Sequence, residues 1–357
     1  MKLAVGFFDG VHLGHRRILG GADAALTFRN HPSTILSPGS VPPLLMSLQE
    51  RLAAIAAALR PDSADSMKIG ELDNRIILNS QFSILNSETQ GLTPQGFRTR
   101  TIEEQDNSRI LNSQFSILNS KVRALEFTEE MKGLTPQGFI DFLKREYPGL
   151  EAIRCGANWR FGAKGAGNAE FARKCGLVVE EVPFVMHRGE AVSSTRIRRA
   201  LADGDVADAA AMLGRPWRLY GEVFPGKGEG RKLGFPTLNL RPLQGSDPML
   251  AGMQGSDPMR GGMQGSVPLR RGVYDVETEL GPGVANWGQA PTMGDEAWKE
   301  CVLEVHLLDK AGLFKPPKML AVDFLGFIRP ERRFSSKDEL ARQIAMDLEN
   351  SLVRHHP

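Results

Sequence analysis

Residues 6–15 read Gly-Phe-Phe-Asp-Gly-Val-His-Leu-Gly-His, and this stretch decides the fold of the first part of the chain. It follows an apolar run, Leu3-Ala4-Val5, that predicts the first strand of a sheet. The dipeptide Asp9-Gly10 predicts a tight turn, and the residues beyond it open a helix. The stretch therefore predicts a strand, a turn and a helix start in direct succession.

Two histidines and two glycines in this turn suggest a seat for an anion. His12 and His15 are three residues apart, so they share one face of a helical first turn. Gly10 and Gly14 allow a bulky anion to approach the backbone. Unpaired N–H groups at a helix start, together with two imidazoles, suit a triphosphate. No Gly-Lys-Ser/Thr follows, so this is not a Walker loop, and this motif alone leaves two solvated histidines as an alternative.

Length and composition exclude several classes of protein. A chain of 357 residues predicts two or three domains. The net charge of +2 argues against a dedicated nucleic-acid binder or a polybasic membrane protein. No apolar run approaches the ~20 residues of a membrane span, and the start lacks a signal-peptide pattern. Cys155, Cys175 and Cys301 lack metal-site spacing, which indicates a reducing cytoplasm.

The crossover after the first strand is short. Residues 16–19 predict a truncated helix that Gly20-Gly21 ends, and residues 24–28 predict the second strand. Parallel strands need a connection of about a dozen residues or more. We therefore expect the first βα unit to be strained or incompletely formed.

Two segments carry internal repeats. The 11 residues from Ile77 to Ser87 recur unchanged at 110–120, and the string Gln-Gly-Ser-Asp-Pro-Met occurs twice between Leu243 and Leu269. Both segments are polar and contain few residues that could build a core. We expect a disordered, dispensable insertion near 65–118 and an expanded loop near 244–266.

Two later stretches add polar side chains to the first half. Asn158 lies in a loop after a predicted strand, where its amide can bind a base or phosphate. The alternative is a loop braced by Trp159 and Phe161 packing inward. Ser194 and Thr195 at a helix start, followed by Arg198, form a second candidate anion site.

The second half changes period and predicts a small closed barrel of short strands, followed by a helix over residues 335–352. Its longest polar loop holds glycines and basic residues that suit a flap over polyphosphate: Gly226, Gly228, Gly230, Arg231 and Lys232. Thr237 and Asn239 alternate on a strand, so their oxygen atoms face one way and suit Mg²⁺. Glu304 lies on the polar face of another strand.

Four of these strings, at residues 6–15, 156–162, 193–198 and 226–239, resemble in order the signatures of the bacterial bifunctional riboflavin kinase/FAD synthetase family. The resemblance covers nearly the whole chain except the two repeat-bearing segments. It implies an α/β plus β fold, with a Rossmann-like nucleotidyltransferase domain over 1–214 and a riboflavin-kinase β-barrel with a C-terminal helix over 215–357. The string at residues 27–32 departs from the family's Thr-Phe-x-Pro-His-Pro at Asn30.

The resemblance also implies an activity: ATP phosphorylates riboflavin to FMN, and a second ATP adenylylates FMN to FAD. Glu304 would be the base of the kinase reaction, and Thr237 and Asn239 would hold Mg²⁺. His12 and His15 would act in adenylyl transfer. Arg329 and Arg332 lie where flavin contact or simple solvation are both open. The phosphate-binding set would be Gly6, Phe8, Gly10, Gly14, Asn158, Ser194, Thr195, Arg198, Gly226, Gly228, Gly230, Arg231 and Lys232.

Two alternatives stay open. In the first, the short crossover impairs the nucleotidyltransferase domain, and the protein has riboflavin kinase activity only. A flavin- or nucleotide-binding protein without turnover is the other alternative, and the joint presence of Glu304, Thr237 and Asn239 speaks against it. The sequence does not indicate an oligomeric state.

Overall fold

The computed structural model describes residues 1–59, 121–226, 228, 230, 234–243, 267–289, 301–308 and 316–355. The chain divides into one unit of residues 1–42 and 48–192 and a second of residues 43–47 and 193–357. The repeat-bearing segments predicted near 65–118 and 244–266 lie outside the described residues. The domain boundary expected after residue 214 stays a prediction.

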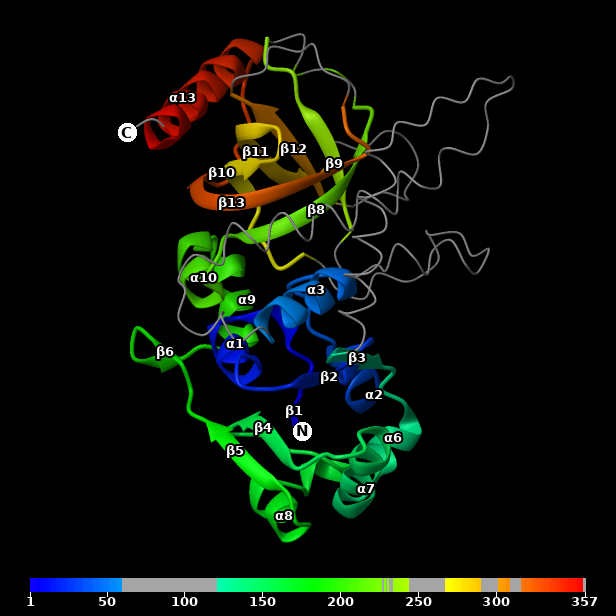
Figure 1. Ribbon diagram of the computed structural model, residues 1–357. Coiled ribbons are helices and arrows are strands. Elements are labelled where there is room, and N and C mark those ends of the chain that lie inside the picture. The colour runs from blue at the N-terminus through cyan, green and yellow to red at the C-terminus, as the bar shows by residue number, and fades with distance from the viewer. Residues whose placement is uncertain are drawn as a thin grey trace, which may run out of the picture. The chain divides into compact units, whose positions relative to one another are not determined.

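The first unit is built on a parallel sheet, as the sequence predicted (Figure 1). Its five strands lie in the order β3-β2-β1-β4-β5, and every neighbouring pair is parallel. The strands are β1 Lys2–Val5, β2 Ala24–Phe28, β3 Val122–Leu125, β4 Ala152–Gly156 and β5 Val178–Val182. A separate hairpin pairs β6 Met186–His187 with β7 Glu190–Ala191.

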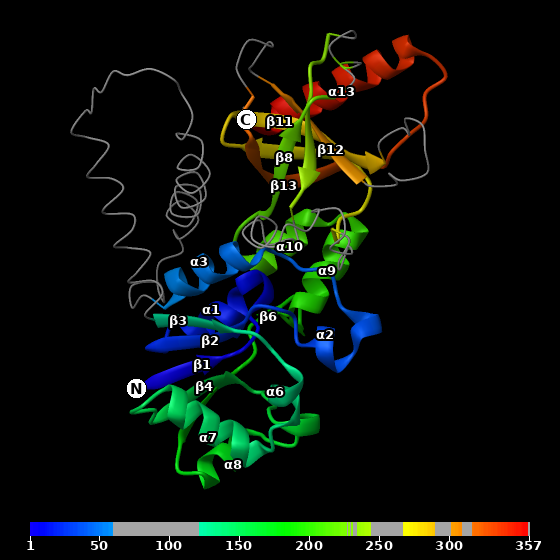
Figure 2. The same cartoon turned by 90° about the vertical axis from the view of Figure 1, so that its right-hand side faces the viewer.

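Helices cover both faces of this sheet (Figure 2). On one face lie α1 and α3, and on the other lie α7 and α8. The helices are α1 Leu13–Leu19, α2 Ser33–Leu36, α3 Leu48–Ala58, α6 Glu129–Gly133, α7 Pro136–Glu146 and α8 Ala169–Lys174, with short 3₁₀ turns η1 Asp9–Val11, η2 Pro38–Ser40 and η4 Ala163–Gly165.

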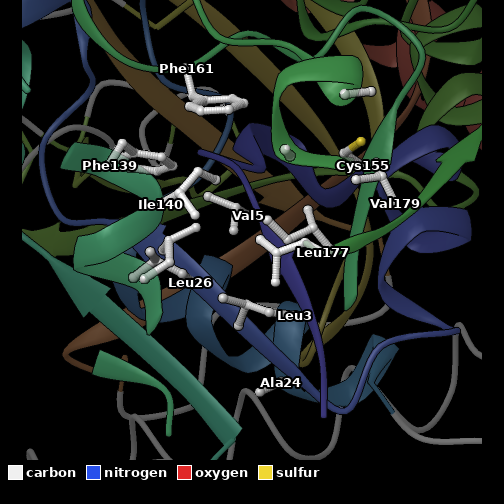
Figure 3. Packing of buried hydrophobic residues seen from close by; sticks show 14 residues of the cluster. Leu3, Val5, Ala24, Leu26, Phe139, Ile140, Cys155, Phe161, Leu177 and Val179 are labelled. Atoms are coloured by element: carbon white, nitrogen blue, oxygen red, sulfur yellow. The ribbon is translucent and has the colours of Figure 1, made fainter. Parts of the chain in front are cut away.

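The core between the sheet and α7 follows from the alternation of side chains along the strands (Figure 3). Leu3 and Val5 of β1 and Leu26 of β2 point to this side, where they meet Phe139 and Ile140 of α7. Each of these side chains is at most 7% exposed. Strand residues between them point to the opposite face, which α1 and α3 cover.

The first βα unit is complete, so the expectation of an incompletely formed unit is wrong. Helix α1 begins at Leu13, directly after the turn as predicted, and has seven residues. Strands β1 and β2 pair in parallel from Leu3↔Ala24 onward. The physical reason is that His12 caps the helix immediately after the turn, so the short connection still holds seven helical residues.

The second unit contains the predicted closed barrel, with the strand order β10-β11-β12-β9-β8-β13. All its neighbouring strands are antiparallel. The strands are β8 Trp217–Phe224, β9 Leu238–Pro242, β10 Gly272–Thr278, β11 Gly281–Gln289, β12 Cys301–Leu307 and β13 Met319–Arg329. Helices α9 Ser194–Asp203 and α10 Val206–Leu213 precede the barrel, and α13 Lys337–His355 follows it.

Helix α13 is fastened to the barrel by buried polar contacts. Ser351 donates a hydrogen bond of 2.6 Å to Asp275 of β10. The carboxylate of Asp347 accepts from both Nε and Nη2 of Arg329, at 2.9 and 2.7 Å. Ionic and hydroxyl pairs of this kind fix the helix in one register on the strands. In the part of the chain that the structure describes, no helix is long and apolar enough to cross a membrane.

Candidate functional sites

The turn after β1 is held in an uncommon backbone conformation. Phe8 has φ 56° and Val11 has φ 39°, both in the left-handed region that residues other than glycine rarely adopt. Gly10 between them has φ 79°, which explains the glycine. Phe8 and Val11 are buried, at 3% and 0% exposure. Burial of these two side chains therefore stabilises a strained loop at the carboxyl edge of the sheet, where such strain is often functional.

The two predicted histidines lie together at the start of α1. The imidazoles of His12 and His15 stack with ring centroids 3.6 Å apart. His12 Nδ1 accepts from the backbone N–H of His15 at 3.3 Å, so His12 is the cap of the helix. The absent side chain of Gly14 leaves room for this ring, because a Cβ there would lie 3.2 Å from His12 Nδ1. Gly6 likewise makes room for the ring of Phe8, 3.0 Å from such a Cβ.

The ring of His15 is buried, and one of its nitrogen atoms lacks a hydrogen-bond partner among the described residues. Burial, and secondarily the neighbouring His12, lower the pKa of His15 well below its ordinary value. Its Nδ1 is buried and has no hydrogen-bond partner among the described residues. A buried polar atom without a partner costs free energy until a ligand or water supplies one. An anion beside the ring would supply a hydrogen-bond acceptor and favour the protonated form.

Sequence reasoning missed Arg51, which packs beneath the same turn. Its side chain is fully buried in α3, and Nη2 donates to the carbonyl oxygen of Phe28 at 2.6 Å. Its Cζ lies 3.8 Å from the ring centroid of Phe7. Burial lowers the pKa of Arg51 to about 10, and the carboxylate of Asp9 opposes this shift. Through Phe7 and Phe28, Arg51 links the ends of β1 and β2. The alanine-rich sequence around Arg51 did not indicate this role.

The departure at Asn30 has a structural reason. Asn30 Nδ2 donates to the carbonyl oxygen of Phe127 at 2.9 Å, and the Phe127 N–H donates to Asn30 Oδ1 at 2.7 Å. Nδ2 also donates to Thr34. A proline at residue 30 could make none of these side-chain bonds. The amide therefore ties the loop after β2 to the loop after β3.

The remaining predicted residues of the nucleotidyltransferase site lie in two places. Asn158 is exposed in the loop after β4, while Trp159 and Phe161 pack together with ring centroids 4.4 Å apart. The bracing by aromatic residues is therefore present, and the Asn158 side chain is still accessible to a ligand. Ser194, Thr195 and Arg198 lie at the start of α9, which belongs to the second unit. Ser193 caps that helix, and Arg198 Nε donates to the carbonyl oxygen of Pro43 at 2.6 Å.

In the second unit, glycines bring the flap against the two predicted metal ligands. A Cβ on Gly226 would lie 2.1 Å from Nδ2 of Asn239, and one on Gly230 would lie 3.4 Å from Oγ1 of Thr237. Only residues without a side chain permit the closest of these approaches. Gly228 has φ 70°, another conformation that favours glycine. Arg231 and Lys232 lie outside the described residues.

Glu304 lies in a row of polar side chains that crosses three strands. Strand register places it opposite Asn239 of β9 on one side and opposite Asn286 of β11 on the other. Its neighbours Leu303 and Val305 are fully buried on the other face, as the alternation predicted. Burial, and then the nearby Glu331, raise the pKa of Glu304. A carboxylate so placed is a suitable proton acceptor.

Two residues beside this row were not predicted. Glu331 lies against β11, since a Cβ on Gly288 would lie 1.8 Å from its Oε1. His306 Nδ1 forms a hydrogen bond of 2.8 Å with the carbonyl oxygen of Pro236 and so holds the segment that precedes Thr237. The signal for His306 was its alternation with Glu304 on β12. Glu331 lies between the two candidate arginines, in a string at 329–334 that resembles the family's Arg-x-Glu-x-x-Phe, and that motif was its signal.

Arg329 and Arg332 already have protein partners. Arg329 is paired with Asp347 of α13, and Arg332 with Glu339 of the same helix. The guanidinium groups of both also lie over the ring of Phe334. A role in flavin binding stays a prediction for these two arginines.

The donor set near Glu304 fits a magnesium ion that is held mainly by nucleotide phosphates. Among the described residues, no group of three or more His, Cys, Asp and Glu side chains could hold a metal ion by itself. Thr237 and Asn239 offer neutral oxygen atoms beside a carboxylate. Mg²⁺ prefers oxygen ligands and commonly keeps only one or two from the protein.

Two family models match the chain, one in its first half and one in its second half. The model of the riboflavin kinase family matches residues 213–353, and the model of the FAD synthetase family matches residues 1–59 and 89–196. A solved structure described as a macrolide-efflux protein from Streptococcus pneumoniae aligns with a TM-score of 0.67 at 22% identity, over 98% of this chain and 93% of that one. At this identity the likeness concerns the fold alone.

Curated relatives are bifunctional riboflavin kinase/FMN adenylyltransferases. That of Pseudomonas fluorescens is 32% identical over 64% of this chain and 68% of its own. Those of Haemophilus influenzae and Bacillus subtilis are 27% and 25% identical over 98% of this chain, and over 92% and 91% of their own. Both family models, these relatives and the two sites just described lead to one conclusion: the chain belongs to the bifunctional riboflavin kinase/FMN adenylyltransferase family.

Proposed function

We propose that this protein phosphorylates riboflavin with ATP to give FMN, and then transfers the adenylyl group of a second ATP to FMN, giving FAD and pyrophosphate. The first reaction is assigned to the barrel and the second to the parallel-sheet unit. We further propose that the protein works in the cytoplasm, where its three free cysteines stay reduced.

The observation that carries the kinase assignment is the row of Asn239, Glu304 and Asn286 beside the glycine flap. Glu304 takes the proton from the terminal ribityl hydroxyl, whose oxygen then attacks the γ-phosphorus of ATP. The bond from that phosphorus to the β,γ-bridging oxygen breaks, and ADP leaves. The raised pKa of Glu304 makes its carboxylate a better proton acceptor than an exposed one.

The glycines of the flap allow its backbone N–H groups to approach the phosphates of ATP. Thr237 and Asn239 are the proposed ligands of Mg²⁺, which supplies positive charge against the phosphate oxygens. Loss of one oxygen ligand, in Thr237→Ala, should raise the Mg²⁺ concentration required for the kinase step alone. An unchanged Mg²⁺ requirement would show that Thr237 is not a ligand.

In adenylyl transfer, a phosphate oxygen of FMN attacks the α-phosphorus of ATP, and the bond to the α,β-bridging oxygen breaks as pyrophosphate leaves. This reaction needs little covalent help, so positioning and charge neutralisation dominate. His15 Nδ1 is buried without a partner among the residues that the structure describes, and this supports a direct contact with phosphate. His12, Ser194, Thr195 and Arg198 are the other proposed phosphate contacts, and Asn158 is the proposed contact of base or phosphate.

The test is a time course with purified full-length protein, riboflavin, ATP and Mg²⁺, in which FMN and FAD are separated and quantified. We expect both products, with FMN appearing first. A second assay starts from FMN, so that adenylyl transfer is measured without the kinase. If the first assay gives FMN and neither assay gives FAD, the protein is a riboflavin kinase without adenylyltransferase activity. Absence of both products in correctly folded protein would refute the proposal.

A further inference from the structure

The C-terminal end of α1 is completed by a side chain from another strand. Two of the four carbonyl groups in its last turn bind backbone N–H groups: Arg16 O accepts from Gly20 at 2.8 Å, and Leu19 O accepts from Ala22 at 3.0 Å. The other two accept from Arg154, whose Nη2 and Nε donate to Arg17 O and Ile18 O at 3.0 and 2.9 Å. Each carbonyl of this last turn is therefore satisfied.

Arg154 occupies the middle of β4 and is held from the other side as well. Its neighbours Ile153 and Cys155 point into the core with α7, so Arg154 points to the face that α1 covers. Its Nη1 donates to Oε2 of Glu180 on β5 at 2.6 Å, and Lys2 of β1 pairs with Oε1 of the same carboxylate at 2.5 Å. The guanidinium is therefore fixed between α1 and the sheet.

The glycine pair after α1 makes this arrangement possible. A Cβ on Gly21 would lie 2.5 Å from Cζ of Arg154 and 2.7 Å from its Nε, closer than any real contact. A cation at this end of a helix is also favoured by the helix dipole. The short connection between α1 and β2 therefore leaves the space that the guanidinium of Arg154 occupies. A longer helix, or a larger residue at position 21, would displace this guanidinium.

We propose that Arg154 is a positioning residue for adenylyl transfer, which fixes α1 from its C-terminal end and so holds His12 and His15 in place. The inference rests on the proposed function. A seven-residue helix does not keep its shape unaided, because helices this short are marginal in water. His12 closes the N-terminal end of α1, and Arg154 provides the corresponding support at the other end.

The main experiment compares Arg154→Met with Arg173→Met. Arg173 is a matched control, because its Nη2 binds Glu181 of β5 and a strand carbonyl at 2.7 and 3.2 Å but is not bonded to α1. For Arg154→Met we expect kcat for adenylyl transfer to FMN to fall on the order of a hundredfold, as displacements of ~1 Å do when catalysis is positional. Phosphorylation of riboflavin should be unchanged, and Arg173→Met should retain both activities.

The same contact can be broken from the helix side. Gly21→Ala pushes the guanidinium away, whereas Gly20→Ala places its Cβ no closer than 3.3 Å to any neighbour. We expect Gly21→Ala to reproduce the loss and Gly20→Ala to leave adenylyl transfer nearly intact. The double variant Arg154→Met/Gly21→Ala should lose no more than either single variant, since both act through one contact. Guanidinium ion at low concentration should restore part of the activity of Arg154→Met.

A readout besides activity separates this proposal from the proposed function. The stacked rings of His12 and His15, with centroids 3.6 Å apart, should shift each other's proton resonances, and NMR of the full-length protein can measure this shift. We expect this shift to be lost in Arg154→Met and kept in Arg173→Met. If the wild-type protein made no FAD, the proposed function would fail, while the ring shifts would still test the role of Arg154. Intact ring shifts with full adenylyl transfer in Arg154→Met, or equal losses in Arg173→Met, would overturn the proposal.

Discussion

The two turns that are proposed to bind phosphate are stabilised in different ways. The turn after β1 depends on buried side chains as well as on its glycines, because Phe8 and Val11 hold a left-handed backbone through their own burial. The flap before β9 is shaped by missing side chains, because Asn239 fills the place where a Cβ of Gly226 would lie. The first turn should therefore fail when a side chain is removed, and the second when one is added.

The largest expected effect is on the chemistry of the barrel. Glu304→Gln removes the proton acceptor while keeping its shape, so we expect riboflavin phosphorylation to fall by about 100- to 10,000-fold. Adenylyl transfer to supplied FMN should persist, since that reaction is assigned to other residues. Steady-state assays of both reactions on the same preparation make the comparison. Equal loss of both in a folded variant would refute the separation of the two sites.

Removing a side chain from the first turn should break its support. Phe8→Ala deletes a buried aromatic ring, which costs about 3–5 kcal/mol of unfolding free energy in typical cores. We expect denaturant unfolding of the first unit at lower concentration and a loss of adenylyl transfer, with kinase activity kept. Full stability together with full adenylyl transfer would show that burial of Phe8 does not hold the turn.

Adding a side chain to the flap should give the converse result. Gly226→Ala forces Asn239 or the flap to move by ~1 Å, so we expect a loss of kinase rate on the order of a hundredfold with little change in stability. Gly133→Ala is the control, because a Cβ there meets no atom within 4 Å. A kinase rate in Gly226→Ala equal to that of the control would disprove the steric explanation.

The smallest expected effect concerns pH. The pKa of His15 is lowered in the folded protein, so near pH 6 the unfolded chain binds more protons than the folded one. The unfolding free energy should therefore fall as pH drops from about 7.5 through the unfolded pKa of about 6.5 to about 5.5. His15→Gln should weaken this dependence. Urea titrations of both proteins at the two pH values test it, and identical pH slopes would contradict the assignment.

Much of the fold could be predicted, because the alternation of apolar and polar residues over a few positions indicates both a strand and its buried face. On β12, apolar residues Leu303, Val305 and Leu307 alternate with Glu304 and His306, and this period alone predicts both the strand and its buried face. The length of β13 could not be predicted, because this strand of 11 residues continues to Arg329 through irregular pairing with β10. Such pairing depends on a distant strand and leaves no local mark.

The candidate site divides in the same way. Motif residues such as His12 and Thr237 could be found because their chemistry is local. Arg51 and Arg154 could not, since each acts through backbone carbonyls that are distant in sequence. A charged residue inside an otherwise apolar strand was the one available signal for Arg154. The pattern did predict the start of α1 after Asp9-Gly10, although a histidine is not a common helix cap.

The reciprocal bonds between Asn30 and Phe127 join residues that are 97 positions apart. Beside them, β2 and β3 pair over four residues, so the first unit is closed here by contacts rather than by chain continuity. We therefore expect two separately produced fragments, one ending near residue 59 and one beginning near residue 121, to reassemble into an adenylyl-transferring protein. Because the two fragments must meet by diffusion, their activity should rise with their concentration, whereas that of the intact chain should not.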